Sequence, residues 1–178
     1  PDAAAVPGAE GLVFTTDSFV VKPLFFRGGD IGSLSVHGTV NDLAVSGAEP
    51  LALSMGLIIE EGFDIETLGR IVRSAASAAS VSNVQIVTGD TKVVARGEAD
   101  QLFVNTAGIG IRRIHPDPKS LQAGDHVLIN GGIAEHGIAV MSEREGIAFE
   151  TRVRSDAAPV WPFVKALIDA GIEPRVMR

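Results

Sequence analysis

The sequence contains no cysteine among its 178 residues. Without a thiol, the chain can form no disulfide bond, no thiolate zinc site and no cysteine nucleophile of its own. It also has no apolar run close to the roughly 20 residues that a helix needs to cross a bilayer, and no secretory signal peptide. We therefore expect a cytoplasmic protein that does not span a membrane.

Basic residues are few and scattered along the chain. The 15 lysines and arginines form no stripe, and against 22 acidic residues they leave a formal net charge of −7. Binding to a nucleic acid backbone requires concentrated positive charge, so this composition excludes nucleic acid as a partner. An acidic chain that handles phosphates would bind them through cations.

Several nucleotide and metal motifs are missing as well. The sequence contains no G-x-x-x-x-G-K-[ST], which excludes a P-loop, and the glycines of TAGIGI do not complete G-x-G-x-x-G. The histidines lack metal-ligand spacing such as H-E-x-x-H, and we interpret them as structural or solvated. They are His37, His115, His126 and His136. His136 stands apart because it lies in a glycine-containing loop.

The residues that are present predict a packed α+β fold. Hydrophobic residues make up 46% of the chain and the mean hydropathy is +0.26, which is enough for a core. The apolar patterns predict a mixed sheet with helices on one face. The predicted strands are residues 12–21 (one strand or two, divided at 16–18), 50–59, 84–87, 92–95 and 101–111. The predicted helices run from an Asp30 cap to about Gly47, and from an Asp64 cap along a face of Ile65, Leu68, Val72, Ala75 and Ala79.

The strand at 50–59, PLALSMGLII, is apolar along nearly its whole length. Such a run is typical of a strand that is covered on both faces. One small domain cannot supply that cover, so the pattern predicts a homodimer.

Residues 114–120, IHPDPKS, contain two prolines and mark a domain boundary. We divide the chain into residues 1–113 and 114–178. The second part is predicted to contain a strand at 126–132, a helix at 136–145 and a helix at 157–171 that Pro162 interrupts early. These residues are too few for an independent core, so we expect the start of a second α/β domain. The chain begins without methionine and ends just after a predicted helix, and we expect it to be a fragment.

Asp42 lies in the middle of the first predicted helix, within GTVNDLA. Asp42 and its neighbour Asn41 are poor helix formers, so their presence there has a propensity cost. Asp17 in TTDS and Asp90 in TGDTK occupy similar polar contexts. Together the three carboxylates could supply the oxygen ligands that Mg²⁺ prefers, and Lys92 could place a positive charge on the same phosphates. Structural explanations stay open: a hairpin turn at TGDTK, a polar strand end at TTDS and a solvated helix face at Asp42.

Five ordered blocks resemble one known family. TTDSFVVKPLFFRGGDIG, GTVNDLAVSGAEPLALS, IIEEGF, IVTGDTKVV and NTAGIG are similar, in this order and spacing, to the HypE family of hydrogenase expression/formation proteins. That family belongs to the superfamily of aminoimidazole-ribonucleotide synthetase, selenophosphate synthetase and thiamine-monophosphate kinase. The resemblance implies a PurM-like N-terminal domain that forms a dimeric barrel. It also implies that ATP is bound without a P-loop, by aspartates and Mg²⁺ at the homodimer interface.

The resemblance implies roles for individual residues. The Mg²⁺ ligands would be Asp17, Asp42 and Asp90. The catalytic residues would be Asp42 and Lys92, and the nucleotide would be bound by Asn41, Gly89, Thr91, Asp17 and Asp90. A mid-helix carboxylate is then explained by the requirements of the site rather than by helix propensity.

The resemblance also implies a reaction. Proteins of the family carry a carbamoyl group on a C-terminal cysteine thiol, delivered by the carbamoyltransferase HypF. ATP-dependent dehydration gives a thiocyanate, and the cyanide passes to iron on the HypC–HypD complex for the NiFe-hydrogenase active site. The family's C-terminal cysteine and glycine-rich N-terminal segment are missing here, so we expect this chain to be inactive as it stands.

A smaller departure is Glu135, which stands before His136 where the family more often has aspartate. Two alternatives to the dehydratase stay open. One is a phosphotransferase similar to thiamine-monophosphate kinase, and the other is a non-catalytic dimerisation module.

Overall fold

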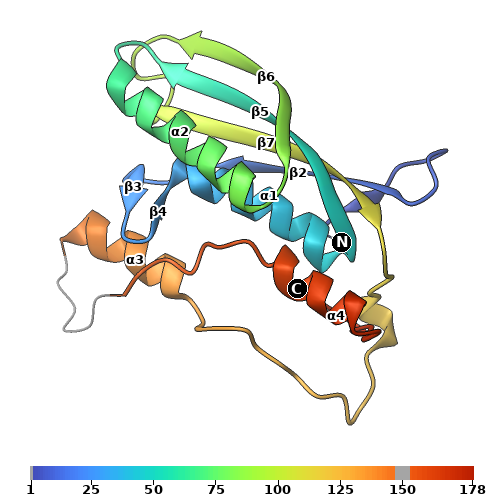
Figure 1. The fold of residues 1–178 in the computed structure, drawn as a ribbon. Coiled ribbons are helices and arrows are strands. Elements are labelled where there is room, and N and C mark those ends of the chain that lie inside the picture. Colours follow the sequence, from blue (N-terminus) through green and yellow to red (C-terminus); the bar gives the residue numbers. More distant parts are fainter. Residues whose placement is uncertain (1, 147–152) are drawn as a thin grey trace.

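The computed structural model describes residues 2–146 and 153–178. Its centre is a five-stranded mixed sheet in the order β1-β2-β7-β5-β6, with α1 and α2 on one face (Figure 1). The strands are β1 (Ala4–Ala5), β2 (Leu12–Phe19), β5 (Ala48–Glu60), β6 (Gln85–Val94) and β7 (Leu102–Arg112), and a small hairpin is formed by β3 (Phe25–Phe26) and β4 (Gly29–Asp30). Among the strand pairs of the described residues, only β5 and β6 are parallel, and α2 connects them. The predicted α+β class with a mixed sheet and helices on one face is confirmed.

Helix α1 (Ile31–Val45) begins at the predicted Asp30 cap. The Asp30 carboxylate accepts from the Gly32 and Ser33 amides at 2.7 and 3.2 Å, and the Ser33 hydroxyl accepts in return from the Asp30 amide. This reciprocal pair of bonds satisfies amides that the first turn leaves free. Almost every side of the helix is covered, because the sheet, α2 and the C-terminal segments all pack against it. A helix in that position can be apolar on most of its surface.

Helix α2 (Ile65–Val81) begins at the predicted Asp64 cap, whose carboxylate accepts from the Thr67 amide at 2.7 Å. The predicted apolar face is partly wrong, because Ile65 and Val72 are 75% and 45% exposed. The buried side chains of the helix are Ile71, Ala75, Ala78 and Ala79. The alanines are small, so α2 can lie close to α1 and the sheet.

Of the two alternatives for residues 12–21, the single strand is observed, because 12–19 form one continuous strand. The prediction of separate strands at 84–87 and 92–95 is wrong, because residues 85–94 form the single strand β6, which runs through TGDTK. TGDTK is therefore not a hairpin turn. Its residues pair in parallel with β5, and Gly89 allows this approach because a Cβ there would lie 2.2 Å from the Met55 carbonyl oxygen.

Strand β5 is covered on one face only in this chain. Leu53 faces the helices and is 1% exposed, whereas Ile58 on the opposite face is 42% exposed. Phe14 and Ile109, which are direct partners on β2 and β7, add to the open face. The predicted cover on both faces is therefore not formed within one chain. The prediction of a homodimer stays a prediction.

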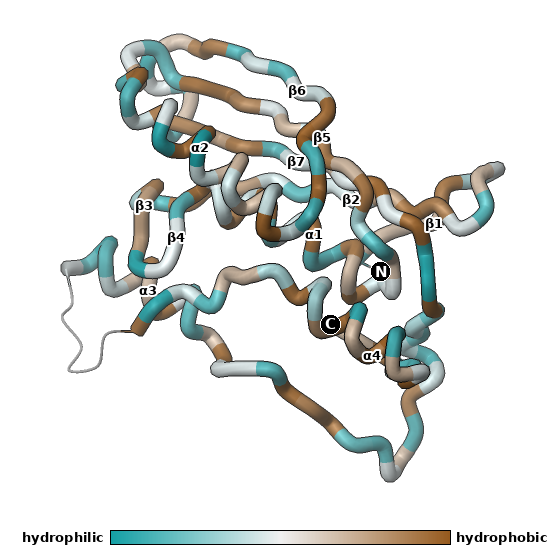
Figure 2. The backbone as a smooth tube through the Cα atoms, viewed as in Figure 1, coloured by the Kyte–Doolittle hydropathy of each residue, from teal (hydrophilic) through white to brown (hydrophobic). Residues whose placement is uncertain are grey.

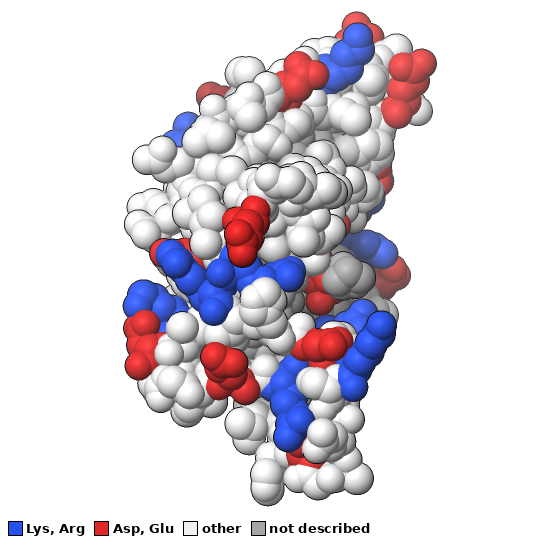
Figure 3. Space-filling model, turned by 90° about the vertical axis from the view of Figure 1, so that its right-hand side faces the viewer, with Lys and Arg blue, Asp and Glu red and all other residues white. Residues whose placement is uncertain are grey.

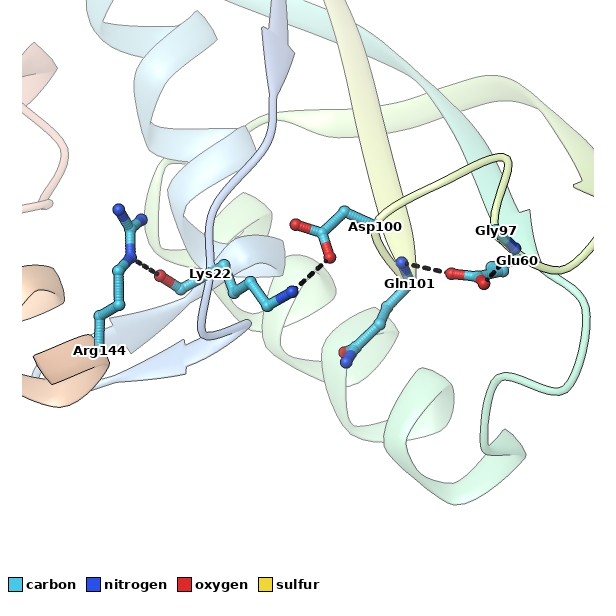
Figure 4. Close-up of polar contacts among 6 residues, drawn as sticks. All are labelled: Lys22, Glu60, Gly97, Asp100, Gln101 and Arg144. Atoms are coloured by element: carbon cyan, nitrogen blue, oxygen red, sulfur yellow. Dashed lines mark hydrogen bonds and ion pairs between the residues drawn. The ribbon is translucent and has the colours of Figure 1, made fainter. Parts of the chain in front are cut away.

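The loop between β6 and β7 is held by polar contacts (Figure 4). The Glu60 carboxylate accepts from the Gly97 and Gln101 amides at 2.7 and 3.0 Å, and these bonds hold the pKa of that carboxyl below its usual range. Lys22 pairs with Asp100 at 2.8 Å on the other side of the loop. Arg144 donates to the Lys22 carbonyl at 2.9 Å, which ties α3 to this end of the sheet.

The C-terminal part contains η1 (Pro118–Ser120), α3 (Glu135–Glu145) and α4 (Trp161–Asp169). The helix predicted at 136–145 is confirmed. The helix predicted at 157–171 begins only at Trp161, and Pro162 lies in its first turn, where a missing amide hydrogen costs little. Pro162 is thus a start signal rather than an interruption.

The strand predicted at 126–132 is not formed. Val127, Leu128 and Ile129 are 96%, 90% and 63% exposed, and they make the hydrophobic stretch on the long segment before α3 in Figure 2. The pattern is apolar enough for a strand, but a strand needs a hydrogen-bonding neighbour. No strand in residues 2–146 or 153–178 pairs with it.

Charged side chains of both signs lie side by side on the face drawn in Figure 3. None of the helices in the described ranges is long and apolar enough to cross a membrane. The segment 114–120 contains only the short helix η1, and the division of the chain at this segment stays a prediction.

Candidate functional site

Asp42 projects from α1 toward β2. Its Oδ2 atom lies 3.1 Å from the Thr15 hydroxyl, which also lies 2.7 Å from the Asp2 carbonyl oxygen. Asp42 is half-buried, and this burial raises the pKa of its carboxyl. The Thr15 hydrogen bond lowers the pKa, whereas the nearby charges of Asp17 and Asp2 raise it further. The solvated helix face is therefore wrong as an explanation of this residue.

Asp17 lies on β2 and faces α1. Asp17 Oδ2 lies in ordinary contact distance of Gly38, 3.6 Å from where a Cβ would be, and the glycine makes room for the Phe19 ring, which would lie 2.7 Å from that Cβ. Gly38 is one turn before Asp42 on the same side of the helix. The structure thus brings Asp17 and Asp42 to one edge of α1, as predicted.

Asp90 lies on another part of the sheet. Strands β7 and β5 separate β6 from β2, which corresponds to about 14 Å between the strands. Across the four strands, the register pairs Ser18 with Asn105, Asn105 with Gly56, and Gly56 with Asp90. Asp90 is thus level with Ser18, and Asp17 is one position away along β2. Because side chains alternate along a strand, Asp90 faces away from α1 while Asp17 faces it.

The predicted convergence of all three aspartates is not formed within one chain. Across residues 2–146 and 153–178, no group of three or more histidine, aspartate or glutamate side chains is placed to hold a metal ion. The roles of Asp17, Asp42 and Asp90 as ligands stay predictions.

The other predicted residues of β6 are exposed to solvent. Lys92 pairs with Ile58 and lies on the same open face as Asp90. Gly89 and Thr91 occupy the alternate positions, and the need for Gly89 is explained by the close approach of β5. Their predicted contacts with a nucleotide are neither supported nor contradicted by this arrangement.

Asn41 makes contacts that the sequence did not predict. Its Nδ2 atom donates to the Ala158 carbonyl at 2.9 Å, and its Oδ1 atom accepts from the Val160 amide at 2.9 Å. The whole amide group is therefore engaged with the segment before α4. Asn41 is next to Asp42 in sequence but projects from a different side of α1.

Sequence reasoning assigned no role to two residues of the site. Thr15 supplies the hydroxyl beside Asp42, and Asn105 donates to the Asp17 carbonyl at 2.9 Å. Both lie in blocks that carry the family resemblance, TTDS and NTAGIG. That position was the available signal, because each lies in a polar stretch of its strand, TTDS in β2 and NT in β7.

The histidines divide into two kinds. His37 is buried, and burial lowers the pKa of its imidazole. His136 makes a T-shaped contact with Phe26, with ring centroids 5.1 Å apart, and its Nδ1 atom lies 3.0 Å from the Ser155 hydroxyl. Glu135 folds back over Gly132, where a Cβ would lie 2.6 Å from Glu135 Oε1. Both residues have structural contacts, and they lie in the first turn of α3 rather than in the loop predicted for His136.

The pair of Asp17 and Asp42 fits a hard divalent cation. Two carboxylates supply the oxygen ligands that Mg²⁺ takes, with water and phosphate oxygens completing the octahedron. Their mutual repulsion and the raised pKa of Asp42 are what a bound cation would relieve. The structure provides such a pair on α1 and β2.

Comparison with known proteins agrees with these observations. Residues 1–112 match the family described as AIR synthase related protein, N-terminal domain. The chain is 52% identical over 165 residues to the carbamoyl dehydratase HypE of Bradyrhizobium diazoefficiens, covering 90% of this chain and 47% of that protein. It is 46% identical over 169 residues to the carbamoyl dehydratase HypE of Escherichia coli, covering 94% and 50%. The chain thus spans about half the length of these curated relatives.

Solved structures resemble it closely. A crystal structure of the hydrogenase maturation protein HypE in complex with ATP has a TM-score of 0.92 at 44% identity, covering 100% of this chain and 54% of that one. HypE in a HypE–HypF complex has a TM-score of 0.89 at 50% identity, covering 95% and 55%. The thiamine monophosphate kinase of Aquifex aeolicus, at 16% identity and a TM-score of 0.67, shares the fold. The extent of these matches shows that the chain belongs to the HypE family of hydrogenase maturation proteins.

Proposed function

We propose that this chain is the nucleotide-binding part of a carbamoyl dehydratase that makes the cyanide ligand of NiFe hydrogenases. The observation that carries this proposal is the identity of 44–52% to proteins named carbamoyl dehydratase HypE, over 90–99% of the chain. The pair of Asp17 and Asp42 adds a physical reason, because it offers oxygen ligands and an unrelieved negative charge.

The reaction removes water from a carbamoyl group that is bound to a thiol. Phosphorylation by ATP turns the amide oxygen into a good leaving group, and loss of phosphate and the amide protons leaves a carbon–nitrogen triple bond. These 178 residues contain no cysteine, so they do not supply the thiol. Their part in the reaction is to hold and orient the nucleotide.

The residues of α1 and β2 would hold the metal and the phosphates. Asp42 and Asp17 would ligate Mg²⁺, and the Thr15 hydroxyl would orient the Asp42 carboxylate. Fixed donors of this kind are effective because they need no reorganisation when phosphoryl transfer begins.

We further propose that a second copy of the chain covers the open face of the sheet. Phe14, Ile58 and Ile109 give that face an apolar surface. Asp90 and Lys92 lie on the same face, so a homodimer would enclose them beside the partner. Light scattering at micromolar concentration tests this arrangement, and a strictly monomeric species would contradict it.

The partners follow from the same relationship. HypF is proposed as the donor of the carbamoyl group, since a relative of this chain is found in a HypE–HypF complex. The HypC–HypD complex is proposed as the acceptor of cyanide, and the cytoplasm as the location. A kinase of thiamine monophosphate is disfavoured, because that likeness is at 16% identity and concerns the fold.

The binding of Mg²⁺-ATP tests the proposal. Calorimetry on this chain is expected to detect binding, and Asp42→Asn is expected to weaken it by about tenfold or more, because a charge-assisted contact contributes about 1.5–3 kcal/mol. Asp64→Asn is the matched control, since Asn also caps a helix and Asp64 lies at the start of α2. Equal affinities for both variants would overturn the role of Asp42. Absence of binding by the unaltered chain would favour the non-catalytic dimerisation module.

The same variant has a predictable effect without nucleotide. Folding raises the pKa of Asp42, so the ionised carboxylate at neutral pH is less stable in the folded chain than in the unfolded one. Asp42→Asn removes this penalty and is expected to raise the melting temperature. In a protein of the relatives' length, it is expected to abolish ATP-dependent thiocyanate formation. A lower melting temperature would show that the loss of binding is due to unfolding.

A further inference from the structure

Residues 153–160, which we term the strap, form the irregular segment directly before α4. The strap is fastened to three different elements. The Ser155 amide donates to the Arg27 carbonyl at 2.7 Å, and the Ser155 hydroxyl lies 3.0 Å from His136 Nδ1. At its other end, Ala158 and Val160 are held by Asn41 of α1.

The strap lies directly on the backbone of the β3–β4 hairpin. A Cβ on Gly28 would be 2.8 Å from the Ser155 nitrogen, so only glycine permits this contact. On α1, His37 is 8% exposed, whereas Asn41, one turn later, is only partly buried. A small displacement of the strap or of α1 would therefore break specific contacts.

Asn41 holds the strap through both ends of one amide group. It donates to one strap carbonyl and accepts from an amide two residues later, as a neighbouring strand would. A carboxylate could not replace it, since Asp lacks the donor that Ala158 requires. The two hydrogen bonds make the Asn41 amide a rigid link between α1 and the strap.

This link is adjacent to the candidate nucleotide site. Asn41 and Asp42 are consecutive residues on one turn of α1, one directed to the strap and the other to Thr15 and Asp17. If Asp42 and Asp17 held a cation, any shift of the Asp42 carboxylate would be shared by the turn of α1 that bears Asn41. The same shift would change the geometry of both Asn41 hydrogen bonds, because a helix turn moves as a unit.

We propose that Asn41 is a positioning residue that couples occupation of the Asp17–Asp42 site to attachment of the strap. The coupling rests on the proposed function, since it requires Mg²⁺-ATP to bind beside Asp42. It is reciprocal: nucleotide binding tightens the strap, and release of the strap weakens nucleotide binding by the same factor. Asn41 thereby transmits the state of the site to α3 and α4, without being a ligand of the nucleotide.

Amide hydrogen exchange, read by NMR, measures the coupling directly. The Val160 amide is the probe because it donates to Asn41, and the Gly97 amide is the internal reference because it donates to Glu60 in the loop between β6 and β7, outside the strap. In the unaltered chain, Mg²⁺-ATP is expected to slow exchange at Val160. In Asn41→Ala, exchange at Val160 is expected to be about fivefold faster without nucleotide, the loss expected for a bond of about 1 kcal/mol, and Mg²⁺-ATP is expected to have no effect on it. Asn130→Ala, at an exposed asparagine outside the strap, is the matched control.

The outcomes separate the two proposals. Nucleotide that binds with no change at Val160, or with an equal change in Asn41→Ala, overturns the coupling and leaves the proposed function intact. If Asn41→Ala weakens binding but leaves Val160 protected, Asn41 is a nucleotide ligand and the coupling is wrong. If Mg²⁺-ATP does not bind at all, both proposals fail together.

Discussion

Residues 2–112 bury their large side chains among themselves, whereas residues 113–146 and 153–178, the second region, bury few of theirs and do so against the first region. Ile31, Leu43 and Leu53 are each at most 1% exposed within the sheet and its helices. In the second region Leu128 is 90% exposed. Its buried apolar residues are Ile114, Ala139, Val140 and Val164.

The second region relies on the core of the first. Val140 of α3 belongs to the same cluster as Phe26 and Ile31, and Trp161 of α4 packs against the cluster of Val36 and Val40. The polar strap supplements these contacts. The difference shows that the sheet, α1 and α2 contain most of the buried large side chains of the described residues, and that α3 and α4 are attached to them by a few specific contacts.

The largest expected effect is on the core of the first region. Leu53→Ala is expected to lower the free energy of unfolding by about 2–5 kcal/mol, because it removes buried methyl groups and leaves a cavity. Leu128→Ala makes the same chemical change at an exposed site and is expected to change it by less than about 0.5 kcal/mol. Urea unfolding followed by far-UV circular dichroism measures both. Equal losses would abolish the distinction between the regions.

Two Gly→Ala substitutions are expected to change the free energy of unfolding in opposite directions. A Cβ on Gly32 would lie 2.3 Å from the Ile71 carbonyl oxygen, so Gly32→Ala must push α1 and α2 apart and is expected to cost about 1–3 kcal/mol. Nothing lies within 4 Å of a Cβ on Gly137 in α3, so Gly137→Ala is expected to stabilise by up to about 1 kcal/mol through helix propensity. A stable Gly32→Ala protein would show that the two helices are not held at this distance.

The single tryptophan provides a local test of attachment. Trp161 lies at the start of α4, so its fluorescence reports the docking of that helix. We expect the fluorescence transition in urea to occur at a lower concentration than the far-UV circular dichroism transition, because α4 buries little surface. Val164→Ala is expected to move the fluorescence transition alone. Coincident transitions would mean that the two regions unfold as one unit.

The smallest expected effect concerns pH. Burial lowers the pKa of His37 below its ordinary value of 6.5, so the unfolded chain binds a proton there more readily than the folded chain. Stability is therefore expected to fall as pH decreases below about 6.5, until the pH passes the lowered pKa of the folded state. His37→Gln removes this proton-binding group and is expected to flatten that part of the pH profile. If the melting temperature of His37→Gln falls with decreasing pH as steeply as that of the unaltered chain, other groups dominate the pH dependence of stability.

Local signals predicted the starts of the first two helices well. Asp30 and Asp64 were recognised as caps because a side-chain carboxylate bonds to amides within three residues of itself. The apolar strands β5 and β7 were also predicted close to their observed limits. The pattern at Val127–Ile129 was read in the same way but failed, since an apolar run does not supply its own hydrogen-bonding partner.

The candidate site was predictable only in part. Asp42 stood out because it contradicts helix propensity, and the structure brings it close to Asp17. Asp90 was expected at a turn, yet it lies within β6, where the pairing with β5 is decided by residues more than 30 positions away. A local reading of TGDTK could not include that pairing.

Sequence alone determined the helix caps, the apolar strands and the membership of a family, because these depend on neighbouring residues or on the order of blocks along the chain. Tertiary structure decided which face of the sheet carries Asp90, which side of β5 stays open and what Asn41 binds. The Asn41 amide meets a carbonyl 117 residues further along the chain. Contacts between such distant residues follow from strand register and helix packing, and these are properties of the whole fold.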